Sequence, residues 1–133
     1  MRSDFQSQQK IFFSWAASSG FIAVIMGAFA AHALNHELAP DLMEVFQTGV
    51  RYQLFHTLAL AVIALIDERS FQSWTTAAGW FFIAGIFLFS GSLYALALSG
   101  VRIWGVITPL GGFCFLTGWM ILFFGNRKKS RTS

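Results

Sequence analysis

The chain has 133 residues, of which 56% are hydrophobic and 11% are charged, and its formal net charge is +3. A soluble domain carries about 25% charged residues, so this composition excludes an ordinary soluble protein. The single cysteine, Cys114, excludes an intrachain disulfide and a cysteine metal cluster. Four long apolar stretches predict an all-α integral membrane four-helix bundle that forms a single domain, residues 1–133.

The predicted membrane spans cover, in chain order, residues 11–34, 50–66, 74–98 and 103–124. A helix needs roughly 20 apolar residues to cross the hydrocarbon core, and all four stretches are close to that length. Between the first two spans, Asn35 ends one helix, while Pro40 and Asp41 suit the start of another. We expect a short interfacial helix there, hinged near Gly49 and leading into the second span.

The distribution of basic residues predicts the orientation of the chain. With four spans, the side that holds both termini has seven basic residues: Arg2, Lys10, Arg69, Arg127, Lys128, Lys129 and Arg131. The opposite side has only Arg51 and Arg102. The positive-inside rule therefore places both termini in the cytoplasm. The basic tail follows the last span directly, which favours an anionic lipid surface and not a nucleic acid as its partner.

Small residues recur along three of the spans at the spacing of a left-handed helix bundle. Membrane helices associate by close packing of small residues, because lipid tails are as apolar as the side chains they touch. Glycines in the first, third and fourth spans follow this pattern, and we predict that they pack helix against helix: Gly20, Gly27, Gly85, Gly111 and Gly118.

Polar side chains from all four spans are predicted to meet in the outer half of the membrane. Polar groups at this depth are costly and often functional. The predicted ligand-binding residues are His32, Arg51, Tyr52, Gln53, His56, Ser90, Ser92, Tyr94 and Thr108. Two of them have a simpler reading: His56 as a hydrogen-bonding residue of the bundle interior, and Arg51 as a side chain that extends to the headgroups.

Other chemistry finds little support in the sequence. His32, His36 and His56 with Glu37 form the best metal-ligand set, but the turn at Asn35 separates two of them, so we predict no metal and no cofactor. A haem would need two deep histidines, and only His56 is deep. No Asp or Glu lies within a span, which argues against proton-coupled export. The nucleophile motif G-x-S-x-G is absent, and we predict no enzyme activity.

Four motifs of the chain are similar to those of a known family. The run Gly27-Ala28-Phe29-Ala30-Ala31-His32 is similar to a G-A-F-G-A-H motif, with Ala30 in place of glycine. Matching segments follow at residues 46–49 and 52–59, at 88–94, and at 108–112. The chain resembles the YgdD/YwdK family of small bacterial inner-membrane proteins, from about residue 14 to 124. The resemblance implies a four-span fold in the bacterial cytoplasmic membrane and implies no activity.

Three functions remain open at this point. The protein binds a lipid, quinone or other small amphiphile in its polar pocket; or it is a structural or assembly subunit of a larger membrane complex; or it is a small oligomeric transporter or channel. The lipid bilayer is the partner common to all three, and a membrane-protein partner or a homo-oligomer is a further expected partner.

Overall fold

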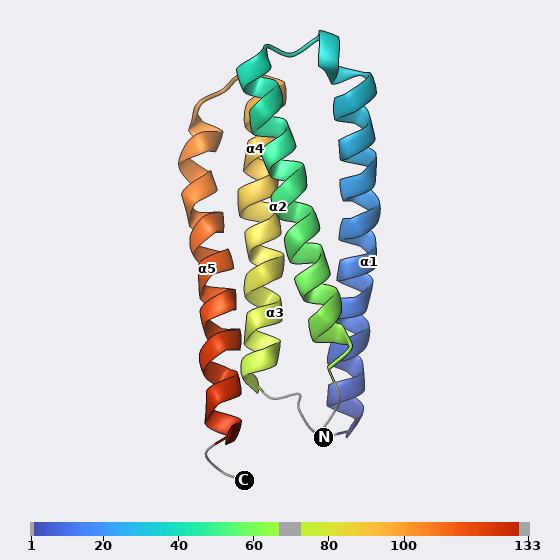
Figure 1. Ribbon diagram of the computed structural model, residues 1–133, viewed down its shortest axis with the longest axis vertical. Coiled ribbons are helices and arrows are strands. Elements are labelled where there is room, and N and C mark those ends of the chain that lie inside the picture. Colours follow the sequence, from blue (N-terminus) through green and yellow to red (C-terminus); the bar gives the residue numbers. More distant parts are fainter. Residues whose placement is uncertain (1, 67–72, 131–133) are drawn as a thin grey trace.

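Four rods of helix run antiparallel along the length of the molecule (Figure 1). The computed structural model describes residues 2–66 and 73–130, with side chains for residues 3–66 and 73–125. The first rod is α1 (Arg2–His32), and a 3₁₀ turn, η1 (Leu34–His36), leads to the second, α2 (Pro40–Ala64). The third rod joins α3 (Ser73–Gly85), the π-helix η2 (Ile86–Gly91) and α4 (Ser92–Ser99); the fourth is α5 (Ile103–Ser130). The first residues of α1 and the last residues of α5 lie at the same end of the bundle (Figure 1).

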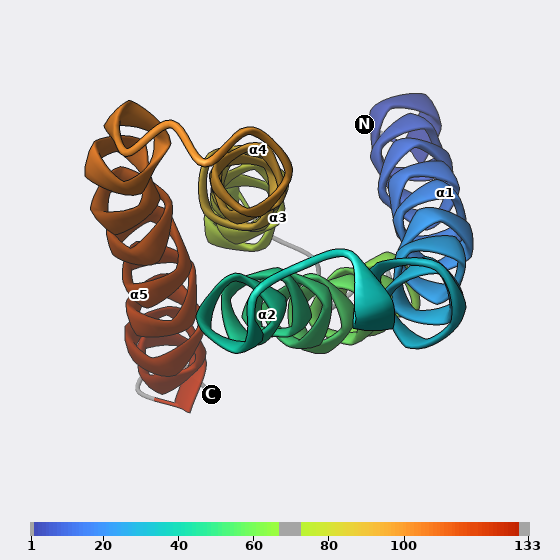
Figure 2. The same ribbon diagram turned by 90° about the horizontal axis from the view of Figure 1, so that it is seen from above.

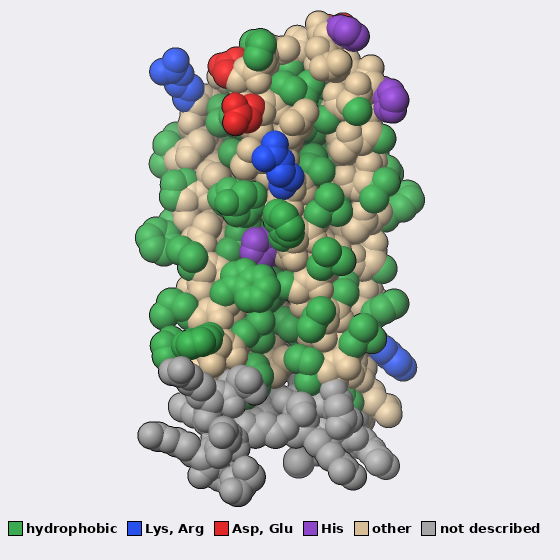
Figure 3. Space-filling view, in the orientation of Figure 1, with side chains coloured by type: hydrophobic (Ala, Val, Ile, Leu, Met, Phe, Trp, Pro, Cys, Tyr) green, Lys and Arg blue, Asp and Glu red, His purple; other side chains and the backbone are tan. Residues whose placement is uncertain are grey.

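The surface and the helix lengths suit a lipid environment. Three helical stretches are long and apolar enough to cross a membrane: Ser3–His32, Ser73–Ser99 and Ile103–Gly125. The helix α2 is of similar length, but polar residues at its centre, including Arg51, Gln53 and His56, lower its hydropathy. Hydrophobic side chains are spread over the side of the bundle (Figure 3). The all-α membrane fold is therefore confirmed, with three helices able to span.

The helix α2 begins ten residues earlier than the predicted second span, and it is unbroken at the position of the predicted hinge. Pro40 stands in its first turn, where the missing N–H costs no hydrogen bond. The helix then continues through Gly49 without a break, so the predicted hinge is wrong. Gly49 instead allows α2 to pack closely against α4, because a Cβ there would lie 2.9 Å from Cε1 of Tyr94 on α4. Residues 40–49, predicted as part of a separate interfacial helix, are thus the first ten residues of one long helix.

The π-helix in the third rod is a feature that the sequence did not reveal. The small residues Ala78, Gly85 and Ser92 recur every seven positions, a spacing that predicts uninterrupted α-helix. The structure instead widens the turn between Gly85 and Ser92. Isolated π-helical turns within α-helices are rare and are frequently found at functional sites. Here the turn places Ser90 against α2 and leaves Gly91 open, with nothing within 4 Å of the position of a Cβ.

Close packing between the third rod and α5 depends on glycine. A Cβ at Gly118 would lie 2.6 Å from the ring of Phe82, and one at Gly85 would run into the ring of Phe115. At Gly111 the neighbour is backbone: a Cβ would press on the amide nitrogen of Phe89 and lie 2.7 Å from its Cα. These two rods can approach so closely only because these positions lack side chains.

The contact between α1 and α2 is less tight. A Cβ at Gly20 would lie 3.4 Å from Thr57, and one at Gly27 would lie 3.6 Å from Val50. These are ordinary contacts or nearly so, and the rest of this seam is alanine, all of it buried: Ala16, Ala23 and Ala30. Whether Gly20 and Gly27 are needed for assembly of the bundle stays a prediction.

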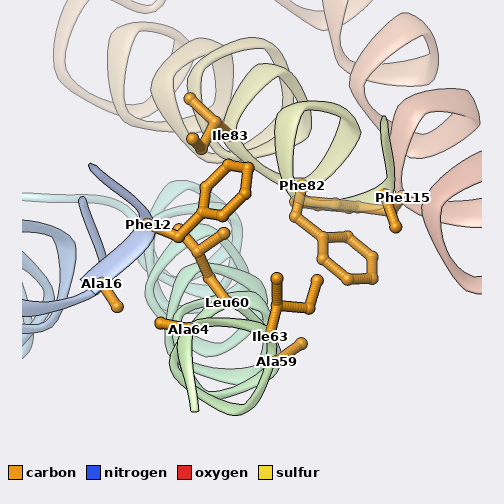
Figure 4. Packing of buried hydrophobic residues seen from close by; sticks show 10 residues of the cluster. Phe12, Ala16, Ala59, Leu60, Ile63, Ala64, Phe82, Ile83 and Phe115 are labelled. Carbon is orange, nitrogen blue, oxygen red and sulfur yellow. The ribbon is translucent and has the colours of Figure 1, made fainter. Parts of the chain in front are cut away.

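The apolar core nearest the termini joins all four rods (Figure 4). Phe12 of α1, Leu60 of α2, Phe82 of α3 and Phe115 of α5 are all at most 4% exposed. Toward the other end, α1 leaves the third rod: it packs along α2 and meets α3 at few points. Figure 2 shows α1 standing apart from α3 and α4, with α2 along one side of the space between them.

Candidate functional site

A groove lies where α1 and the third rod separate, and its volume is about 210 Å³. We call it the lateral groove. One wall is α1, with Trp15, Ser18, Ser19, Ile22 and Met26. The base is α2, with Gln53 and Leu60. The other wall is the third rod, with Ile83, Ile86, Phe87, Ser90, Gly91 and Tyr94.

The lateral groove lies at the middle of the bundle, not in its outer half. Its lining on α1 runs from Trp15 to Met26, which is the central part of a helix that covers residues 2–32. An edge-to-face pair bridges its two walls, because the rings of Trp15 and Phe87 have centroids 5.6 Å apart. The lateral groove is thus a site at mid-depth, and a polar pocket in the outer half stays a prediction.

A buried chain of hydrogen bonds forms the polar part of the groove. Gln53 Nε2 donates to the carbonyl oxygen of Ser19 at 3.0 Å and to its Oγ at 3.3 Å. The Tyr94 hydroxyl donates to Gln53 Oε1 at 2.6 Å, and the hydroxyls of Ser19 and Thr57 share a bond of 2.7 Å. These bonds tie α1, α2 and α4 together across the groove.

The π-helix adds a further hydrogen bond to this region. The Ser90 hydroxyl donates to the carbonyl oxygen of Gly49 on α2 at 2.7 Å. Ser90 is 1% exposed and Gln53 is 4% exposed, so the hydrogen bonds of these two side chains are shielded from solvent. Buried polar groups are nearly always bonded in this way. Of the nine predicted ligand-binding residues, Gln53, Ser90 and Tyr94 therefore meet at one groove.

His56 belongs to a different environment, between α2, α3 and α5. Its ring stacks on Phe115 with centroids 3.4 Å apart and an interplanar angle of 7°. Its Nδ1 lies 2.7 Å from the Tyr52 carbonyl oxygen, which can only accept, so Nδ1 carries the proton. The Trp119 indole donates to Nε2 at 3.1 Å. Both ring nitrogens are thus occupied within the protein, which supports the interior hydrogen-bonding reading of this histidine.

The other predicted residues are placed apart from the groove. Ser92 and Thr108 share a hydrogen bond of 2.7 Å between α4 and α5. The exposed Tyr52 ring lies over Phe89, with centroids 4.6 Å apart. His32 and Arg51 are both exposed. The structure therefore distributes the nine residues over several places, and their binding of a ligand stays a prediction.

Metal-ligating side chains do not converge in the part of the chain that the structure describes. Within these residues, no group of three or more His, Cys, Asp or Glu side chains could hold a metal ion. His32 stands at the end of α1 and His36 in the following 3₁₀ turn, both exposed, whereas His56 is buried among aromatic rings. Arg69 and Arg131, on which the predicted orientation partly depends, lie outside the described residues, as do the side chains of Arg2 and residues 126–130.

Most residues that line the groove were not among the predicted site residues, and two of these make contacts across it. Ser19 holds the amide of Gln53, and Trp15 forms part of the rim of the groove. Consecutive serines at 18 and 19 inside an apolar span are a usable signal, because polar groups at membrane depth need partners. Which of them faces inward depends on the rotation of α1 about its axis.

Comparison with known sequences identifies the family. The family described as "Protein of unknown function (DUF423)" matches residues 26–112. The chain belongs to the DUF423 family. It is 46% identical to the UPF0382 inner membrane protein YgdD of Escherichia coli K12 over 117 residues, which cover 88% of this chain and 89% of that protein. It is 43% identical to the UPF0382 membrane protein YwdK of Bacillus subtilis over 114 residues, 85% of this chain and 93% of that protein.

The comparison confirms the resemblance that the four motifs carried. Relatives of this DUF423 protein are named as membrane proteins, and the Escherichia coli one as an inner membrane protein, so the predicted location in the bacterial inner membrane is confirmed. No solved structure matches the chain. The family carries no assigned activity, and any function has to be argued from the site.

Proposed function

We propose that this DUF423 protein crosses the membrane four times, with both termini in the cytoplasm. The helix α2 lies alongside the other rods over most of their length (Figure 1), which supports its role as the fourth span despite its polar centre. Its buried polar residues are satisfied within the bundle, because Gln53 and His56 each bond to neighbouring groups. Such bonding makes a polar helix tolerable in lipid.

The orientation has a direct test. Green fluorescent protein fused after Ser133 should fluoresce, and alkaline phosphatase fused at the same position should be inactive, because the excess of basic residues holds that end in the cytoplasm. The same reporters inserted in the 3₁₀ turn, between Asn35 and His36, should give the opposite pattern. Active phosphatase at the C-terminus would reverse the proposed orientation.

We further propose that the protein binds one small amphiphile, such as a lipid or a quinone, in the lateral groove. The observation that carries this proposal is the groove itself: about 210 Å³ at mid-depth, between α1 and the third rod. An apolar cavity of about 150 Å³ is large enough to bind benzene. The lateral groove therefore has room for a ring or for a length of apolar chain.

The side chains that line the groove suit the binding of a ligand and not the catalysis of a reaction. It combines hydroxyls with apolar and aromatic side chains, as small-molecule sites commonly do. Activation of a serine requires an adjacent base, and none of the described residues that line the groove is a His, Asp, Glu, Lys or Cys. The proposal is thus a binding protein that has no enzyme activity.

Filling the groove should abolish binding and leave folding intact. Gly91 lines the groove, has helical dihedral angles (φ −59°, ψ −44°) and has nothing within 4 Å of the position of a Cβ. Gly91→Leu should therefore fold normally and reduce ligand occupancy at least about tenfold, a difference of about 1.4 kcal/mol. Native mass spectrometry of protein extracted in nanodiscs from its own membrane measures occupancy as an added mass.

The matched control introduces a leucine on α1, on the face of that helix that points away from the groove. Ala28 is exposed and lies opposite the groove-lining face of that helix, so Ala28→Leu should keep the added mass. An added mass that persists in Gly91→Leu at wild-type occupancy would show that the ligand binds elsewhere. A wild-type protein that carries no added mass would count against amphiphile binding.

A further inference from the structure

The lateral groove adjoins a second hollow, nearer the start of α1. This hollow is lined by Lys10, Ile11, Ser14, Trp15 and Ser18, and we call it the basal hollow. Trp15 and Ser18 line both hollows, so one leads into the other along the helix. The exposed surface of the lateral groove is almost wholly apolar. A polar part of an amphiphile bound there therefore has to lie beyond the groove.

The polar side chains of the basal hollow are accessible to a ligand. Lys10, Ser14 and Ser18 are spaced four residues apart, so they follow one face of α1, and all three are exposed. Thr48 and Thr117 each donate a hydrogen bond to the carbonyl oxygen one turn earlier in their helices. Among the residues that the structure describes, the hydroxyls of Ser14 and Ser18 have no hydrogen-bond partner. Both can therefore donate to a ligand.

The basal hollow has a positive charge at the level of the lipid headgroups. Gln9 Nε2 donates to the carbonyl oxygen of Ile66 at 2.9 Å, so this part of α1 lies beside the end of α2 (Figure 1). The neighbouring Lys10 is thus near a membrane boundary, where a lysine extends its ammonium to the headgroups. None of the described residues that line this hollow is an Asp or Glu. The ammonium therefore suits an anionic group of a ligand.

The length of the two hollows together matches the depth of one leaflet. Met26 lies at the far end of the lateral groove on α1. At 1.5 Å per residue, the path from Lys10 to Met26 is about 24 Å along the helix. One leaflet of a bilayer, with its headgroups, is about 20–22 Å thick. A phospholipid with its phosphate at Lys10 therefore has the length to extend an acyl chain past Trp15 into the lateral groove.

We infer that the occupant of the lateral groove is an anionic phospholipid of the cytoplasmic leaflet. Its phosphate pairs with Lys10, its glycerol and ester oxygens accept hydrogen bonds from Ser14 and Ser18, and one acyl chain fills the groove. This inference rests on the proposed function and selects one class among the amphiphiles. A quinone has no negative charge to offer Lys10. Cytoplasmic leaflets contain anionic lipids, and the proposed orientation turns Lys10 toward that leaflet.

Two phospholipids with the same palmitoyl and oleoyl chains test the inference: phosphatidylglycerol, which is anionic, and phosphatidylcholine, which has no net charge. Titration of the delipidated full-length protein by native mass spectrometry gives an affinity for each. Phosphatidylglycerol should bind about fivefold more tightly, which corresponds to about 1 kcal/mol for one lysine at an anionic surface. Glycerol phosphate, which has the charged group and no acyl chain, should not bind at concentrations that saturate phosphatidylglycerol.

Two variants with the same net charge locate the effect. Lys10→Gln removes the cation of the basal hollow and should bring the preference for phosphatidylglycerol close to one, whereas Lys10→Arg should keep it. Arg102→Gln removes an exposed cation between α4 and α5 and should also keep the preference. Gly91→Leu should weaken both lipids equally, because it removes space for the chain and no charge. A thermal unfolding curve for each variant confirms that the affinities refer to folded protein.

The outcomes separate the inference from the function beneath it. Equal affinities for the two lipids in the wild-type protein, both weakened by Gly91→Leu, overturn the anionic class and keep the groove as a binding site. A preference that survives in Lys10→Gln, or that Arg102→Gln lowers as much, also overturns it. Binding of glycerol phosphate alone, or lipid binding that Gly91→Leu leaves unchanged, overturns the joint use of groove and hollow. Failure of both lipids to bind overturns the inference, and the proposed function then stands only if protein from its own membrane carries an added mass.

Discussion

Gly111→Ala should destabilise the bundle strongly, although it adds only one methyl group. The added Cβ would press on the backbone nitrogen of Phe89 and lie 2.7 Å from its Cα. A backbone atom in a helix cannot rotate away as a side chain can, so α5 and the π-helix would have to separate. Overpacking of a well-packed core typically costs about 1–3 kcal/mol and occasionally more. We expect the free energy of unfolding to fall by at least that amount.

The neighbouring glycine is the control. A Cβ at Gly112 would lie 3.9 Å from the nearest atom, on the ring of Phe89, and that is ordinary contact. Gly112→Ala should therefore be neutral or stabilise the helix by up to about 1 kcal/mol, because alanine favours helix over glycine. Unfolding of both variants by sodium dodecyl sulfate in mixed micelles measures the difference. Equal stability of the two variants would mean that α5 and the π-helix do not approach as closely as the structure shows.

His56→Ala should also cause a large loss of stability, because the histidine holds three helices together. The change removes a buried ring stacked on Phe115 and leaves the Trp119 indole N–H without its acceptor. Truncation of large buried side chains to alanine costs about 2–5 kcal/mol, and a donor without a partner adds to this cost in lipid. The free energy of unfolding should fall within or above that range, by the same measurement in mixed micelles.

Two comparisons isolate the cause of this loss. His32→Ala changes an exposed histidine at the end of α1 and should leave stability unchanged. A double-mutant cycle of His56→Phe and Trp119→Phe keeps aromatic rings in place and removes only the bond between them; the coupling energy should be about 0.5–1.5 kcal/mol. A coupling energy of zero would show that the bond to Trp119 does not stabilise the fold, and a His56→Ala variant as stable as wild type would exclude a structural role for the histidine.

The helices themselves follow from the sequence. Long apolar runs must form helices in lipid, because only a helix satisfies every backbone group within one segment. Pro40 and Gly100 mark helix boundaries for local reasons: proline suits a first turn, and Gly100 ends α4 with a φ of 68°, which glycine adopts without strain. The motif at Gly27–His32 and its three companions identified the family on sequence alone.

The sequence predicts much less well which side of each helix faces the interior of the bundle. A soluble helix shows an apolar stripe that marks its inward side, but a membrane helix is apolar all round. The sequence therefore placed His56, Tyr94 and Ser90 at similar depth without showing that they face different neighbours. The tertiary structure decided this, because helix rotation sets which side chains meet: Tyr94 turns to Gln53, while His56 turns to Trp119.

The lateral groove also depends on packing between distant segments. It exists because α1 packs along α2 and leaves the third rod, while a π-helical turn brings Ser90 against α2. Neither the path of α1 nor the extra residue in that turn has a local signal in the sequence, since both depend on how side chains of different helices fit together. The sequence by itself determined that this is a helical membrane protein of the DUF423 family. Only the tertiary structure decided where a ligand could lie and which atoms would face it.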